Sequence, residues 1–197
     1  TDSRLEEEVE TDILRIWFLA SVFHDYAYSV AQMDRWLRQY FIRVRIPRHP
    51  ELLFGWCDLY VEYETERAIL VRAFTECFGW NETSVATIIR NGFLDKHDHA
   101  VIGALMTMNI LKQARIEQFI LNESCAAIAL HSDYMYSGLE GLSLNKSPFA
   151  FLLTFCDTAQ EWGRPTIATG LQNTRATLDS ITCLDGHVEV GLAYGDL

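Results

Sequence analysis

Adjacent histidine and aspartate residues, His24 and Asp25, directly follow an apolar run from Ile16 to Phe23. Imidazole and carboxylate groups both bind metals, and a carboxylate in apolar surroundings needs a compensating cation, because leaving it unpaired costs several kcal/mol. Three later apolar segments each carry one further side chain of this kind. These side chains are His99, His131 and Asp157. We therefore expect all five residues to form a metal site.

Two histidines compete for one ligand position in the segment from Lys96 to His99. Asp98 suits the N-cap position of a helix, which makes His99 the first helical residue and the favoured ligand. His97 lies in the preceding loop, where it could contact substrate or support a ligand. His131 ends an apolar helix. A lone histidine at the end of such a helix is usually a core residue, but the presence of four other candidate ligands favours His131 as a ligand. Ser132 and Asp133 would then support the ligand from outside the metal's own coordination.

Hydrophobic periodicity predicts a mainly α-helical chain. Ser147 and Pro148 mark the start of a helix that ends at Gly163, and its apolar residues should carry Asp157 into the interior. Loops are expected over 46–56 and 137–146. A short C-terminal β-hairpin, about 178–195, with its turn at Asp185-Gly186, should pack on the helical body. The other predicted helices cover about 4–23, 30–42, 58–78, 81–93, 99 onward, the residues before His131, and 166–176.

The order of these features resembles the HD-domain superfamily of metal-dependent phosphohydrolases. An HD dipeptide follows an apolar helix, histidines begin a Gly-Ala helix and end an Ala-Ile helix, and an aspartate lies in LLTFCDTAQEWGRP. The resemblance covers roughly residues 13 to 165 and implies an HD-domain-like helical bundle. Two features depart from the family: residues 1 to 23 contain no histidine, and HDYAYS replaces the usual small-residue and lysine pattern.

The resemblance implies hydrolysis of a small phosphorylated molecule, such as a nucleotide, by a metal-activated water. Asp25 and His99 would be the catalytic residues. A nitrogen and oxygen ligand set suits Mn, Fe, Co, Ni, Zn or Mg. The departures leave open a regulatory module that binds metal or ligand without hydrolysis. A redox enzyme is a third reading, although the short ligand count argues against two metals.

Arginines are concentrated in the segment 35–48, which contains no acidic residue. This excess could form a phosphate-binding rim beside the metal, but charge runs more often form a solvated face. Other substrate cations could be Lys96, Lys146 or Arg164, and Glu161, one turn after Asp157, could orient a ligand or pair with Arg164.

Composition indicates one domain spanning residues 1–197. The chain is 49% hydrophobic and carries a net charge of -11, which argues against a nucleic acid polymer as partner. Its front apolar run is too short for a membrane span. Five cysteines without a CxxC pair are expected to be buried in a reducing cytoplasm. The sequence leaves a homo-oligomer open.

Overall fold

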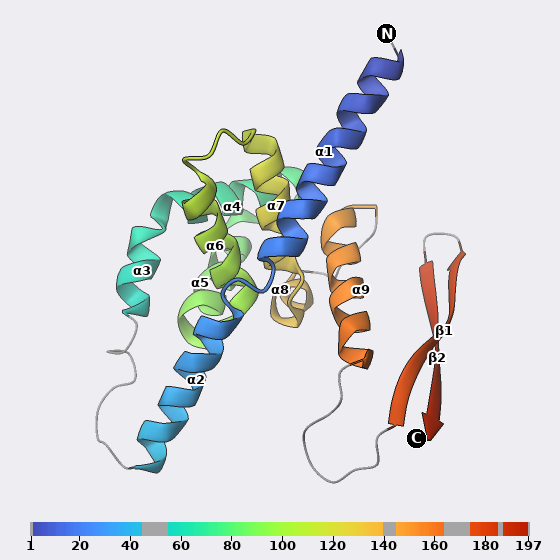
Figure 1. Cartoon of the computed structure of the whole chain (residues 1–197). Helices are drawn as coiled ribbons and strands as arrows, with labels where there is room; N and C mark the ends of the chain where they lie inside the picture. Colours follow the sequence, from blue (N-terminus) through green and yellow to red (C-terminus); the bar gives the residue numbers. More distant parts are fainter. Residues whose placement is uncertain (1, 45–54, 140–144, 164–173, 185–186, 197) are drawn as a thin grey trace.

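The computed structural model describes residues 2–44, 55–139, 145–163, 174–184 and 187–196, and it is mainly α-helical (Figure 1). Helices α1 (Asp2–Phe23) and α2 (Tyr28–Arg43) run nearly in line and are joined by the link 24–27 (Figure 1). The link is a pair of tight turns, in which the amides of Tyr26 and Tyr28 donate to the carbonyls of Phe23 and Asp25 at 3.0 and 2.9 Å. It therefore places His24 and Asp25 between two long helices.

The centre of the molecule is formed by α6 (His99–Leu111) and α7 (Gln118–Leu130), which pack against each other. Most residues of both helices are buried, as expected for helices that are apolar around the whole circumference. Helix α1 lies on α7, and α9 (Pro148–Gly163) packs beside both. The predicted starts of α6 and α9 and the predicted end of α7 before His131 are therefore confirmed.

The prediction of one continuous helix over 58–78 is wrong, because the segment forms two helices, α3 (Trp56–Glu62) and α4 (Glu64–Phe78). Tyr63 lies at the break, where it is 7% exposed and packs against Phe93 with ring centroids 6.2 Å apart. Tertiary packing of this aromatic side chain explains a break that no glycine or proline marks. Helix α4 ends as predicted at Gly79, which adopts a left-handed φ of 69°.

Helix α5 (Glu82–Asn91) begins as predicted after Asn81, whose side chain accepts from the Ser84 amide at 3.1 Å. It continues into a π-helix, η2 (Gly92–Lys96), which the sequence did not indicate. The loop predicted over 137–146 is also wrong at its start, because residues 137 and 138 belong to α8 (Asp133–Gly138). Most of the predicted loop over 46–56 and residues 140–144 lie outside the described residues.

The C-terminal part contains two antiparallel strands, β1 (Thr174–Leu184) and β2 (His187–Asp196). The helix predicted over 166–176 is wrong for residues 174–176, which are paired in β1, and its remainder lies outside the described residues, as does the predicted turn at Asp185-Gly186. None of the helices in the described ranges combines the length and hydropathy that a membrane span requires.

Candidate metal centre

His24 directly follows α1 and is oriented by that helix. Its Nδ1 lies 2.8 Å from the carbonyl oxygen of Ser21, so the N–H is on Nδ1 and the lone pair of Nε2 faces the site. The Nε2 atom lies 3.5 Å from Oδ2 of Asp25. The Asp25 side chain is 43% exposed, so the expectation that Asp25 lies in an apolar setting is wrong. The carboxylate is instead accessible to solvent.

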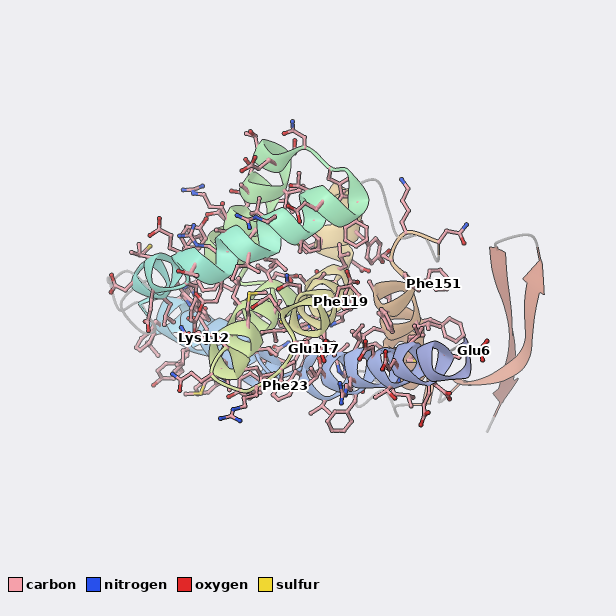
Figure 2. All side chains as sticks on the ribbon, turned by 90° about the horizontal axis from the view of Figure 1, so that it is seen from above. Glu6, Phe23, Lys112, Glu117, Phe119 and Phe151 are labelled. Carbon is pink, nitrogen blue, oxygen red and sulfur yellow. The ribbon has the colours of Figure 1, made fainter. Side chains whose placement is uncertain are left out.

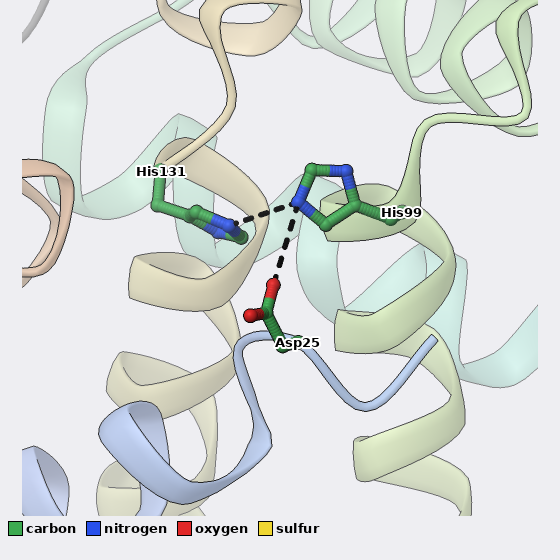
Figure 3. A group of neighbouring side chains, drawn as sticks. All are labelled: Asp25, His99 and His131. Carbon is green, nitrogen blue, oxygen red and sulfur yellow. Dashed lines mark hydrogen bonds and ion pairs between the residues drawn. The ribbon is translucent and has the colours of Figure 1, made fainter. Parts of the chain in front are cut away.

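His99 is placed by the start of α6. Oδ1 of Asp98 accepts hydrogen bonds from the amides of Ala100 and Val101, both at 3.1 Å, which fixes the first turn of the helix. The Nε2 atom of His99 lies 3.9 Å from Oδ1 of Asp25 and 3.2 Å from Nε2 of His131 (Figure 3). The predicted first helical position of His99 is therefore confirmed, and it directs the imidazole at Asp25.

His131 is the C-cap of α7 and is 4% exposed. Its Nδ1 lies 2.5 Å from the carbonyl oxygen of Ile128, which assigns the N–H to Nδ1 and leaves a lone pair on Nε2. Burial lowers the pKa of His131, and the neighbouring His99 and His24 lower it further. The ring is therefore held in the neutral form that binds metals.

Asp157 reaches the site from α9, with Oδ1 3.9 Å from Nε2 of His24. Its side chain is 31% exposed. The prediction that α9 carries this carboxylate into the interior is therefore wrong, and Asp157 lies at the edge of the site. The many apolar residues of α9 predicted that the whole helix is deeply buried. The exposure of a single side chain, however, depends on which neighbouring elements cover that side of the helix.

The five side chains form two overlapping groups that could each hold a metal ion. In each group the ligand atoms lie within 4.8 Å of one another. Asp25 belongs to both groups, with Oδ1 toward His99 and Oδ2 toward His24. Asp25 is therefore shared by the two groups, and the groups together contain all five predicted ligands. The groups are Asp25, His99 and His131, and His24, Asp25 and Asp157.

An aromatic side chain that the sequence did not single out also contacts the site. The Tyr28 ring meets the His99 ring edge to face, with centroids 5.4 Å apart at 89°. The nearest atoms to a Cβ added at Gly103 would be the His24 carbonyl oxygen and Ala27 Cβ, at 3.6 and 3.7 Å. Helix α6 therefore passes close to the link, which helps to hold His24 and His99 together.

His97 belongs to a different cluster from His99. It adopts a left-handed φ of 48°, and its ring stacks on Trp56 at a centroid distance of 5.1 Å. Its Nδ1 lies 3.7 Å from Oδ2 of Asp34, which also accepts from Nε of Arg38 at 2.6 Å. Sequence reasoning missed this cluster, although the spacing of Asp34 and Arg38 by four residues is the signal of a helical ion pair.

The residues expected behind His131 have other roles. The Ser132 side chain accepts from the Met135 amide at the start of α8, and Asp133 accepts from the hydroxyl of Tyr136. Arg43 is also distant from the site, because it lies about 22 Å along α2 from Tyr28. Arg43 thus belongs to a solvated face. Lys96 and Lys146 are exposed, and Arg45, Arg48, Arg164 and the Glu161 side chain lie outside the description.

Comparison with known proteins found no match to the chain among family models, curated proteins or solved structures.

Proposed function

We propose that the chain is a metal-dependent phosphohydrolase of the HD-domain type, which acts on a small phosphorylated molecule such as a nucleotide. The observation that carries the proposal is the placement of Asp25 between two imidazole groups, with one carboxylate oxygen toward His24 and the other toward His99. The five candidate ligands come from four segments of the chain, and these segments follow one another in the order of the HD-domain resemblance.

The chemistry of the donor atoms fits a divalent ion. The Nε2 atoms of His99 and His131 lie 3.2 Å apart, and His131 has its N–H on the opposite side of the ring. In the described part of the chain, no lysine or arginine forms an ion pair with Asp25 or Asp157. Among the described residues, histidines are therefore the only side chains that pair with these carboxylates, and a metal would supply a further positive charge.

The metal, the Asp25 carboxylate and the histidines would have different roles in hydrolysis. A divalent metal held here would polarise a phosphoryl oxygen and lower the pKa of a water molecule. Asp25, which is 43% exposed, would accept a hydrogen bond from the attacking water and orient it toward phosphorus. The Ser21 and Ile128 carbonyls keep the His24 and His131 rings in fixed orientations, so the donor atoms need little rearrangement.

A second function is favoured by the ion pairs of the described residues, none of which brings a lysine or an arginine to the site. Phosphoryl transfer usually needs cationic side chains on the phosphate in addition to metal, and the described lysines and arginines form no ion pair within the site. A module that binds metal or a ligand for regulation would need no such cations. This alternative also agrees with HDYAYS in place of the small-residue and lysine pattern that usually follows the HD dipeptide in the family.

Metal analysis followed by an activity panel separates the two functions. The purified chain should contain stoichiometric metal by inductively coupled plasma mass spectrometry, and with added manganese it should hydrolyse phosphomonoesters, phosphodiesters or nucleotides. Asp25→Asn should lose metal and turnover, whereas Asp12→Asn, a change at a partly exposed position midway along α1, should lose neither. Stoichiometric metal without turnover on any substrate class would favour the module, and a metal-free protein after incubation with manganese, zinc and iron would contradict both.

A further inference from the structure

Exposed apolar side chains are concentrated in one part of the molecule. Of the sixteen large hydrophobic side chains that are exposed in the described residues, twelve lie between Val9 and Val44, on α1, the link and α2. Isolated exposed apolar residues are ordinary, but a concentration of this size marks an interaction surface.

On α1, the apolar residues form two opposite stripes. Ile16 and Ala20 are 2% and 0% exposed and face the bundle. Phe18 lies two residues from each, which is about 200° around the helix, and is 63% exposed. Leu14 and Val22, one turn to either side of Phe18, are 60% and 54% exposed. This outer stripe has no partner among the described residues.

Helix α2 repeats this arrangement. Ala31 and Asp34 are buried on the inner side, at 5% and 1% exposed. Met33 and Trp36 each lie two residues further along and are 55% and 63% exposed, on the opposite side of the helix. Tyr40 continues the stripe and stacks on Trp36, with ring centroids 5.8 Å apart at 17°. The stacked aromatic side chains are thus ordered by each other while facing solvent.

The two outer stripes together are large enough for a stable interface. With about 200 Å² for each large side chain, the exposed fractions of the six residues correspond to roughly 700 Å² of apolar surface. A standard interface buries about 800 Å² per partner. The six residues are Leu14, Phe18, Val22, Met33, Trp36 and Tyr40.

The charges beside the stripes have opposite signs on the two helices. Between residues 6 and 15, α1 carries five acidic side chains and one basic one, Arg15. On α2 the sole acid, Asp34, is buried against Arg38, which leaves Arg35 and Arg43 as the exposed charges. The same chain therefore presents an acidic apolar helix and a basic apolar helix, each complementary to the other.

We propose that this surface binds a second copy of the chain, with α1 of each copy antiparallel to α2 of the other. A two-fold axis near Tyr26 satisfies both contacts at once, because α1 and α2 run nearly in line on either side of the link (Figure 1). Glu10 lies sixteen residues before Tyr26 and Arg43 seventeen after it, which is about 24 and 25 Å of helix. The axis therefore places Glu10 of one copy opposite Arg43 of the other.

The same axis aligns the apolar stripes. Phe18 lies eight residues before Tyr26, and Met33 and Trp36 lie seven and ten residues after it. Phe18 of one copy would therefore pack between Met33 and Trp36 of the other. Both stripes lie opposite to the residues that face the bundle. Figure 2 shows side chains of α1 extending away from the other helices. The surface is thus self-complementary in its apolar residues and in its charge.

Analytical ultracentrifugation of the whole chain tests the proposal first. The wild type should sediment as a dimer, at twice the chain mass of 22.6 kDa. Phe18→Glu should raise the dissociation constant at least tenfold, and Leu152→Glu, an exposed change on α9, should leave it unchanged. A wild type that stays monomeric at its highest soluble concentration would overturn the proposal and leave the surface to a different partner.

A charge exchange then tests which helices meet. The double variant Glu7→Lys, Glu10→Lys and the double variant Arg35→Glu, Arg43→Glu should each be monomeric, because positions 10 and 43, which the axis places opposite each other, then carry like charges. An equimolar mixture should form a heterodimer, since each α1 then meets an α2 of opposite charge. Circular dichroism of each variant controls for folding. Dimers of either variant alone, or a folded mixture that stays monomeric, would contradict the contact between α1 and α2.

Discussion

Nε2 of His99 and Nε2 of His131 face each other at 3.2 Å in the interior of the candidate metal centre (Figure 3). His131 bonds the Ile128 carbonyl through Nδ1, so its Nε2 carries a lone pair toward His99. A neutral His99 with its N–H on Nε2 can donate a hydrogen bond to this lone pair, and a divalent metal bound to both nitrogens would replace that hydrogen bond. Burial lowers the pKa of His131, which keeps its ring in the neutral form that binds metals.

Removing the buried imidazole should therefore remove metal binding. We expect His131→Ala to lose its metal, measured by calorimetric titration with manganese or zinc. In the wild type, metal at a hundredfold excess over Kd should add about 2.7 kcal/mol of stability, which corresponds to roughly 5 to 10 °C in Tm for a domain of this size. The variant should show no such shift.

His97→Ala is the matched control for this prediction. His97 lies two residues before His99, but its ring stacks on Trp56 and belongs to neither metal group. Its metal content should equal that of the wild type even if its Tm is lower. Retention of metal by His131→Ala, or its loss from His97→Ala, would contradict the assigned ligands.

The buried pair of Asp34 and Arg38 should dominate the stability of the contact between α2 and the bundle. Asp34 is 1% exposed, and its Oδ2 accepts from Arg38 Nε at 2.6 Å. Arg38→Ala leaves this carboxylate buried without its cation, and we expect a loss of about 3 kcal/mol in the free energy of unfolding. Urea denaturation measures it. Arg35→Ala, an exposed arginine on the same helix, should change stability by less than about 0.5 kcal/mol.

The five candidate ligands could be predicted because each has a local signal. The HD dipeptide ends a periodic helix, Asp98 caps the helix of His99, and His131 ends an apolar run, so residue type and helix boundaries identify them. Sequence reasoning also located Asp157 on a helix that begins at Pro148. Local pattern thus carries the identity of the site residues and the helices that position them.

The exposure of side chains and the continuity of helices could not be predicted in the same way, because both depend on contacts between segments that are distant in the sequence. The exposure of Asp25 and Asp157 depends on how α1, α6 and α9 approach one another. The break at Tyr63 follows from packing on Phe93, thirty residues later. Asp34 is an ordinary polar residue in sequence, and only the fold buries it. The exposure of the outer stripes of α1 and α2 likewise depends on which faces of these helices the rest of the bundle covers.

Two glycines in neighbouring elements should respond oppositely to alanine. A Cβ at Gly92 would lie 2.9 Å from Tyr134 Cε1 and 3.0 Å from Val101 Cγ2, so Gly92→Ala should cost about 1 to 3 kcal/mol. At Gly103 the nearest atom is 3.6 Å away, so Gly103→Ala should stabilise α6 by roughly 0.5 to 1 kcal/mol. Thermal unfolding of both variants measures the difference. Destabilisation by Gly103→Ala would show that α6 needs a closer approach to the link.

The cysteines should differ sharply in reactivity, although all five were expected to be buried. Cys57 is exposed, which corrects that expectation, whereas Cys125 is fully buried in α7. Burial raises the pKa of the Cys125 thiol to about 12. Because the thiolate is the reactive form, iodoacetamide at pH 8 should label Cys57 and leave Cys125 unmodified, as read by peptide mass spectrometry.

The raised pKa of Cys125 also predicts how stability varies with pH. A thiol whose pKa is higher in the folded state than in the unfolded state keeps its proton longer when folded. The stability that this group contributes is therefore present below the unfolded pKa of about 8.5 and is lost as the pH rises toward 12. Cys125→Ala should reduce this loss between pH 9 and about 11 in urea denaturation, whereas Cys57→Ala should leave the profile unchanged. Labelling of Cys125 in the folded protein at pH 8 would show that α7 opens to solvent.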